Sequence, residues 1–127
     1  MNKKQIKVLF QVAALFNISV ALTLLFATEI FLEILQFGDT PTQPVFIHLF
    51  AIIVLMFGGL YYYISSNPLA CRKEMYFGMY AKLGVVAVCV IDTTLGIVVW
   101  TINIPVFFDL VFAYLFYKAS NSKSIAD

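Results

Sequence analysis

The chain has 127 residues, of which 62% are hydrophobic and 12% charged, and its mean hydropathy is +0.94. A soluble domain keeps about a quarter of its residues charged, so the composition excludes a water-soluble globular protein. The net charge of +1 and the lack of a basic patch argue against nucleic acid as a partner.

Four apolar stretches are each long enough to cross a hydrocarbon core about 30 Å thick, which takes about 20 residues. Pro44 suits the first turn of the second stretch, and Asn67 and Pro68 break it. The run after Lys7 is too long for a signal peptide, so we expect a retained first span. We predict an all-α fold, a four-transmembrane-helix bundle forming one integral membrane domain over 1–127, with spans at about 7–27, 44–66, 76–100 and 104–118.

A short polar–apolar segment follows the first span. Glu29, Glu33 and Gln36 recur at helical spacing among isoleucine, leucine and phenylalanine residues, and Gly38 ends the pattern. This spacing predicts a short amphipathic helical segment that lies at the interface or folds back onto the bundle.

The basic residues predict the orientation, because cytoplasmic loops of membrane proteins are enriched in lysine and arginine. The segment 28–43 between the first two spans carries acidic residues and no lysine or arginine. We therefore expect both termini in the cytoplasm and the segment 28–43 on the outer side of the membrane. Seven of the eight basic residues agree with this orientation: Lys3, Lys4, Lys7, Arg72, Lys73, Lys118 and Lys123.

Aromatic residues suggest interfacial belts. Trp100 is expected at the outer end of the third span. Six tyrosines are expected near the inner boundary as anchors: Tyr61, Tyr62, Tyr63, Tyr76, Tyr114 and Tyr117.

Five polar side chains within the spans are candidate binding residues, since a charge at mid-bilayer costs at least about 2.5–3.5 kcal/mol. They are Asn17, His48, Lys82, Asp92 and Asp109. Asn17 shares a helical face with three alanines, and Asp92 shares one with small residues from Gly78 to Gly96. Such faces suit close packing in lipid, so we expect both side chains to point into the bundle.

Several roles remain open for these residues. If the faces converge, His48, Asp92 and Asp109 share the outer half of the bundle above Asn17, where they could bind a divalent cation, relay protons or bind a polar head group. The structural alternative is that Asp109 benefits from a helix N-terminus, that His48 is solvated, and that Asp92 is protonated or bonded to a neighbouring polar group.

Lys82 is the one basic residue inside a span. It is too far along the helix from Asp92 to pair with it. Either it extends to the inner interface, or it binds a phosphate or carboxylate head group beside the tyrosines.

No catalytic residue, metal site or cofactor is predicted. The three acidic and histidine side chains come from different spans and show no local ligand spacing. Cys71 and Cys89 form no C-x-x-C pair, which argues against a thiol oxidoreductase. We expect Cys89 to be a small packing residue.

Two segments, Tyr76–Gly84 and Phe108–Phe116, carry a resemblance. With the four-span layout, they resemble small bacterial inner-membrane proteins of the DoxX-like kind and their uncharacterised relatives. The resemblance implies a four-helix bundle in a bacterial inner membrane and association with a redox or envelope system. It supplies no catalytic residues to carry over to this chain. Small multidrug exporters also have four spans, but their first span carries an essential glutamate, where this chain has only Asn17.

Three functional hypotheses follow. The first is a non-catalytic accessory subunit or lipid- or hydrophobe-binding bundle, with the bilayer, a bound hydrophobic ligand, further copies of the chain or a membrane protein as partners. The second is a small ion-coupled transporter or channel that uses Asp92 with His48 or Asp109. The third is an intramembrane lipid-modifying enzyme with Asp92, Asp109 and His48 as acid–base groups.

Overall fold

Four long helices and two short ones make up the fold in the computed structural model, which describes residues 1–125. No strand occurs within those residues, so the predicted all-α class is confirmed. The four long segments are apolar enough to cross a membrane, with the last one spanning η1 and α5. In chain order the elements are α1 (Lys3–Phe26), α2 (Thr28–Ile34), α3 (Val45–Ser66), α4 (Arg72–Thr94), the 3₁₀ helix η1 (Trp100–Ile102) and α5 (Asn103–Ser120).

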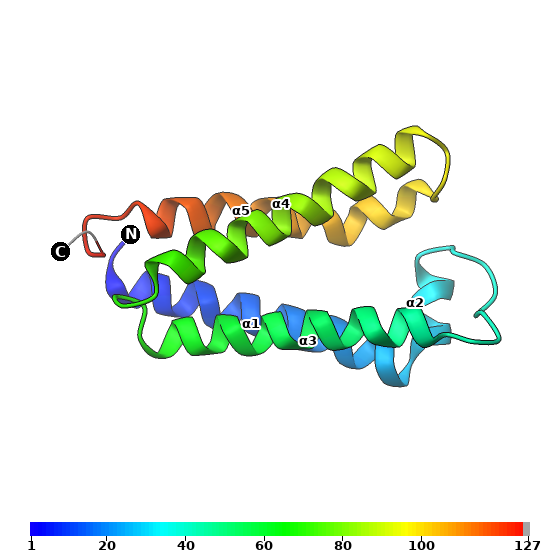
Figure 1. Ribbon diagram of the computed structural model, residues 1–127, viewed down its shortest axis with the longest axis horizontal. Helices are drawn as coiled ribbons and strands as arrows, with labels where there is room; N and C mark the ends of the chain where they lie inside the picture. Colours follow the sequence, from blue (N-terminus) through cyan, green and yellow to red (C-terminus); the bar gives the residue numbers. More distant parts are fainter. Residues whose placement is uncertain (126–127) are drawn as a thin grey trace.

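The long helices are arranged as two pairs (Figure 1). α1 packs along the length of α3, and α4 packs along α5. The pairs meet at the end where both termini lie, which we call the closed end. They separate toward the opposite end, which we call the open end, where α2 lies between them.

Aromatic packing holds the closed end together. The rings of Phe10 and Phe116 stack with their centroids 4.4 Å apart, and Tyr61 meets Phe116 edge-on at 5.0 Å. These three side chains belong to α1, α5 and α3, so the two pairs are joined here. Gly78 on α4 lets Tyr61 approach, since a Cβ at this position would lie 2.9 Å from Cε1 of that ring.

The helix ends follow from local sequence. Asn2 caps α1 in a capping box: its Oδ1 accepts from the backbone N–H of Gln5, and the Gln5 Oε1 accepts from the N–H of Asn2, both at 2.9 Å. This satisfies two donors that a helix start would leave without partners.

The third span differs from the predicted range 76–100. α4 already begins at Arg72, and it ends at Thr94. It ends there because Gly96 adopts φ +71°. The Gly96 N–H donates to the Thr93 carbonyl, and the Ile97 N–H donates to the Asp92 carbonyl. This is a Schellman motif, which terminates helices. Gly96 therefore lies outside the helix and not on the predicted face of small residues.

The predicted amphipathic segment forms the helix α2. It ends in the same motif, with Gln36 at φ +59° in the left-handed position and Phe37 donating to the Leu32 carbonyl. Leu32 is buried and Ile34 is exposed, so α2 presents one apolar side to the rest of the bundle.

Candidate functional site

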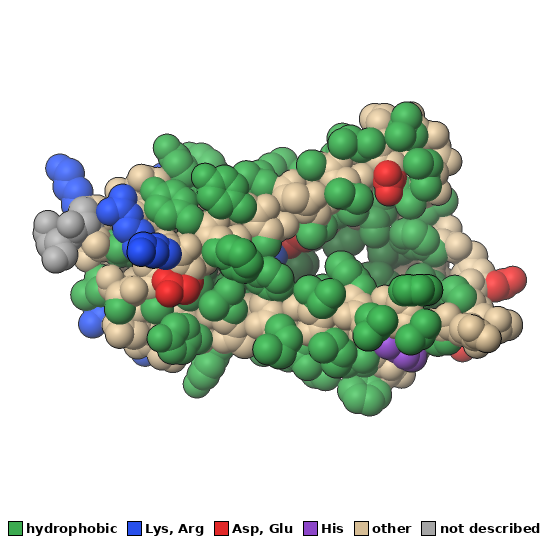
Figure 2. Space-filling view, viewed as in Figure 1, with side chains coloured by type: hydrophobic (Ala, Val, Ile, Leu, Met, Phe, Trp, Pro, Cys, Tyr) green, Lys and Arg blue, Asp and Glu red, His purple; other side chains and the backbone are tan. Residues whose placement is uncertain are grey.

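A cavity of about 560 Å³ lies between the two helix pairs. All four long helices contribute to its walls, and α2 and the segment 37–41 line its mouth at the open end. Figure 2 shows this hollow between the two halves of the molecule, bordered mainly by apolar side chains. Its size is within the range of small-molecule sites.

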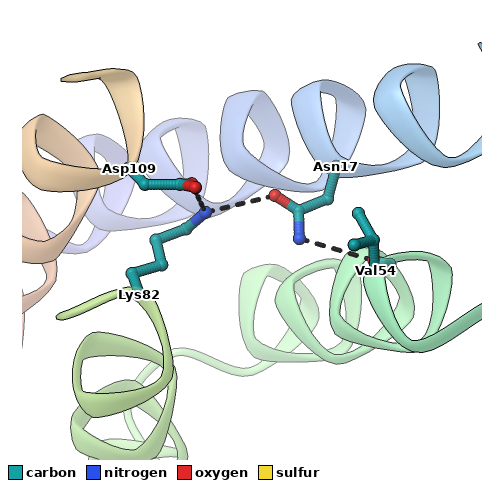
Figure 3. A network of polar contacts seen from close by, with 4 residues as sticks. All are labelled: Asn17, Val54, Lys82 and Asp109. Atoms are coloured by element: carbon teal, nitrogen blue, oxygen red, sulfur yellow. Dashed lines mark hydrogen bonds and ion pairs between the residues drawn. The ribbon is translucent and has the colours of Figure 1, made fainter. Parts of the chain in front are cut away.

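The deep end of the cavity is polar. The Lys82 ammonium on α4 forms an ion pair with Asp109 on α5 and donates to the Asn17 Oδ1 on α1 at 3.2 Å. The Asn17 amide in turn donates to the Val54 carbonyl on α3 at 3.4 Å. Figure 3 shows Lys82 between its two acceptors, so one chain of polar contacts connects all four long helices.

Three aromatic rings surround the ammonium of Lys82. Its Nζ lies 5.9, 5.4 and 5.2 Å from the ring centroids of Phe16, Tyr61 and Phe112, respectively. At these distances the faces of the rings stabilise a cation. The charge is therefore stabilised by a carboxylate, an amide and aromatic rings.

Helical position brings these residues together. Asn17 is buried on the same face of α1 as Ala13, Ala14 and Ala21, as predicted. Lys82 is one turn from Gly78 and follows Ala81, which also lines the cavity. The sequence signal for an inward-facing Lys82 was thus its proximity to the small-residue face.

The expectation that Lys82 extends to the inner interface is wrong. Its side chain is only 5% exposed, because Asp109 and Asn17 offer acceptors at its own depth. An intramembrane partner removes the advantage of reaching water or a head group.

Tyr61 is also not the interfacial anchor that the sequence suggested. It is 1% exposed, whereas its neighbours Tyr62 and Tyr63 are 63% and 60% exposed. Adjacent residues on a helix are about 100° apart, so only Tyr61 faces the bundle interior and lines the cavity.

His48 lies apart from the polar cluster. It is half-buried near the start of α3, and its Nε2 lies 3.3 Å from the hydroxyl oxygen of Thr28 at the start of α2. It does not line the cavity. His48 therefore connects α2 to α3 at the open end.

Asp92 is half-buried near the end of α4 and does not line the cavity either. Within residues 1–125 its carboxylate has no hydrogen-bond partner, while its backbone carbonyl accepts from Ile97. His48, Asp92 and Asp109, whose convergence the sequence left open, do not share one site, and Lys82 takes the central place with Asn17 and Asp109. No group of three His, Cys, Asp or Glu side chains in the described part of the chain could hold a metal ion.

One hydrogen bond crosses the mouth of the cavity. The buried hydroxyl of Thr101 in η1 donates to the Leu35 carbonyl at the end of α2. This contact joins the two halves at the open end. The sequence offered no signal for it, because the two residues are far apart in the chain.

Phe16, Tyr61 and Phe112 were not predicted to surround a cation. In the sequence the two phenylalanines resemble ordinary apolar filler and Tyr61 resembles an interfacial anchor, so only the position of Lys82 reveals what the three rings share. No family model, curated protein or solved structure matches the chain.

Proposed function

We propose that the protein is a non-catalytic, integral membrane bundle that binds a lipid or another hydrophobic ligand in the cavity between its two helix pairs. The observation that carries this proposal is the cavity itself, whose walls are apolar and aromatic along most of their length. Ligand pockets typically combine such walls with a few polar groups that fix orientation.

A matched pair of substitutions on α4 tests this function. Val85 lines the cavity, and Val88 is exposed on the outside of the helix. We expect Val85→Phe to fill the cavity and remove bound ligand from native mass spectra of the protein released from nanodiscs. The Val88→Phe variant should keep the ligand. Equal ligand occupancy in both variants would exclude the cavity as the binding site.

The proposal includes an accessory role and an orientation. The four-span layout and the segments 76–84 and 108–116 support a DoxX-like relationship, with a redox or envelope protein or further copies of the chain as partners. Co-purification after mild extraction is the test of partners.

Basic side chains gather at the end that holds the termini (Figure 2), which supports a cytoplasmic closed end in a bacterial inner membrane.

Labelling with an impermeant maleimide tests the orientation. In a variant without native cysteines, Asp39→Cys should react from outside intact cells and Lys73→Cys only after permeabilisation. The reverse pattern would invert the proposed topology.

Ion-coupled transport is the second candidate function, and the buried Lys82–Asp109 pair favours it. Ionisable residues inside membrane spans often mark ion pathways. Proton uptake into liposomes containing the protein, followed with an enclosed pH dye, should fall in Asp109→Asn and persist in Asp92→Asn. Uptake equal to that of empty liposomes would remove this candidate.

The enzyme alternative has less support. Within residues 1–125 no hydrogen bond joins any two of His48, Asp92 and Asp109. The acid–base pair on which that alternative depends is therefore missing from the described structure.

A further inference from the structure

The polar groups of the cavity are all at one depth, apart from Asp39 at the mouth. Each long helix contributes one of these polar side chains, and on each helix it is among the lining residues closest to the closed end. The four are Asn17 on α1, Tyr61 on α3, Lys82 on α4 and Asp109 on α5. From this layer toward the mouth the walls are almost entirely apolar. A ligand that fills the cavity thus has one polar end and a long apolar body.

The length of the cavity fits an extended chain. Phe46 near the mouth and Tyr61 at the deep end both line it from α3. At 1.5 Å per residue they are about 22 Å apart along the helix. This is more than half the thickness of a hydrocarbon core.

The polar layer offers donors. A lysine ammonium has three N–H groups, and Lys82 uses one for Asp109 and one for Asn17. The Asn17 amide has two, and one goes to the Val54 carbonyl. The Tyr61 hydroxyl has no hydrogen-bond partner among residues 1–125. Three donors are therefore left over, and buried donors favour a ligand with an acceptor.

The charge of the layer is balanced. Asp109 neutralises Lys82, and three aromatic rings stabilise the ammonium further. An added carboxylate or phosphate would bring a second anion close to Asp109 in a medium of low dielectric constant, where unpaired charge is costly. An uncharged oxygen acceptor uses the free donors without this cost.

We propose that the cavity binds an uncharged amphiphile with its oxygen-bearing end at Tyr61, Lys82 and Asn17 and its apolar body pointing to the mouth. The inference rests on the proposed binding function and names the class of ligand: a long-chain alcohol, ketone or ester. Membrane lipids with a hydroxyl or ester head and free hydrophobic molecules share this chemistry.

Photolabelling in nanodiscs tests the ligand class. The probe is a hexadecanol that carries a diazirine on its chain, and the fraction of labelled protein is read from the intact mass. Unlabelled hexadecanol, hexadecanoate and hexadecane compete at equal mole fractions of the lipid. We expect hexadecanol to compete best. Stronger competition by hexadecanoate would overturn the preference for an uncharged head, and equal competition by hexadecane would show that no polar recognition occurs.

Two matched tyrosine variants test the position of the head. Tyr61→Phe removes only a hydroxyl without a protein partner, so it leaves the packing intact. One neutral hydrogen bond contributes about 0.5–1.5 kcal/mol, so we expect a loss of affinity for hexadecanol of about two- to tenfold. Tyr62→Phe, on the exposed side, should change nothing. Unchanged affinity in Tyr61→Phe would overturn the proposed orientation.

The Val85→Phe variant separates the two proposals. If it abolishes labelling while the Tyr61→Phe variant and the competitors show no preference, the cavity binds hydrophobic molecules and the inference about the head is wrong. If labelling persists unchanged in Val85→Phe, the binding function itself fails. Mass spectrometry of molecules extracted with the purified protein then distinguishes a membrane lipid from a free hydrophobic ligand.

Discussion

Lys82 on α4 forms an ion pair with Asp109 on α5, so these two side chains neutralise each other's charge between the two helix pairs. Removing one partner of a buried pair costs about 3–5 kcal/mol, because the other charge is left uncompensated. We expect Lys82→Met and Asp109→Leu each to lower the thermal unfolding temperature in detergent strongly. The double variant, which buries no charge, should recover most of the loss. A double variant that is as unstable as the sum of the single variants would contradict this account.

Gly58 on α3 allows the close approach of α1. A Cβ at this position would lie 2.8 Å from the Ile18 Cγ1 and 3.3 Å from the Ile18 backbone nitrogen, whereas a Cβ at Gly59 would meet nothing within 4 Å. Overpacking costs about 1–3 kcal/mol. We expect Gly58→Ala to destabilise the bundle by that amount in unfolding with a denaturing detergent, and Gly59→Ala to have no such cost. Equal stability of the two variants would show that the contact between α1 and α3 accommodates an added methyl group without cost.

The bond from Thr101 to the Leu35 carbonyl should hold α2 across the mouth of the cavity. Thr101→Val keeps the shape of the side chain and removes the donor. We expect faster hydrogen exchange in the backbone of α2 and faster exchange of the hexadecanol probe. Thr94→Val is the control, since the Thr94 hydroxyl donates to Ile91 within its own helix. Unchanged exchange rates in α2 would mean that other contacts hold it in place.

Cys71 lies in the turn before α4, and burial, with a smaller contribution from Glu74, raises the pKa of its thiol. Thiolate is the reactive form, so alkylation by iodoacetamide should be slow at pH 8. In the Cys89→Ala variant we expect the rate to rise at a higher pH than in the same protein unfolded in detergent. The folded protein holds the proton of the Cys71 thiol more tightly than the unfolded protein does, because the pKa of this thiol is higher in the folded state. This difference stabilises the folded state at neutral pH, and the stabilisation is lost as the pH rises and the thiol ionises. Identical pH profiles for folded and unfolded protein would contradict it.

The sequence predicted the four spans, the helix α2 and the inward position of Asn17, because length, apolar composition and the spacing of small residues are local properties of the chain. It did not predict that Lys82 pairs with Asp109. That contact depends on the depth of Asp109, and the predicted span at 104–118 placed this residue only one turn below the outer boundary.

The connection between α4 and α5 decides that depth. Gly96 ends α4 early, and helical structure resumes at Trp100 with η1. Asp109 is then about 13 Å along the last span, counted from Trp100 at 1.5 Å per residue. His48 and Asp92, which the sequence also offered as candidates, stay near the open end. The depth of Asp109 therefore depends on Gly96, which adopts a left-handed backbone conformation. The periodicity of apolar residues does not reveal how this glycine positions the next helix.

The shared charge of α4 and α5 has a consequence for biogenesis. The ribosome completes α1 and α3 first, and these helices can pack against each other in the bilayer without a charged residue between them. α4 then brings Lys82 to the translocon before Asp109 has been made. Its lysine opposes partitioning into lipid until α5 arrives, so the last two helices should leave the translocon together as a hairpin.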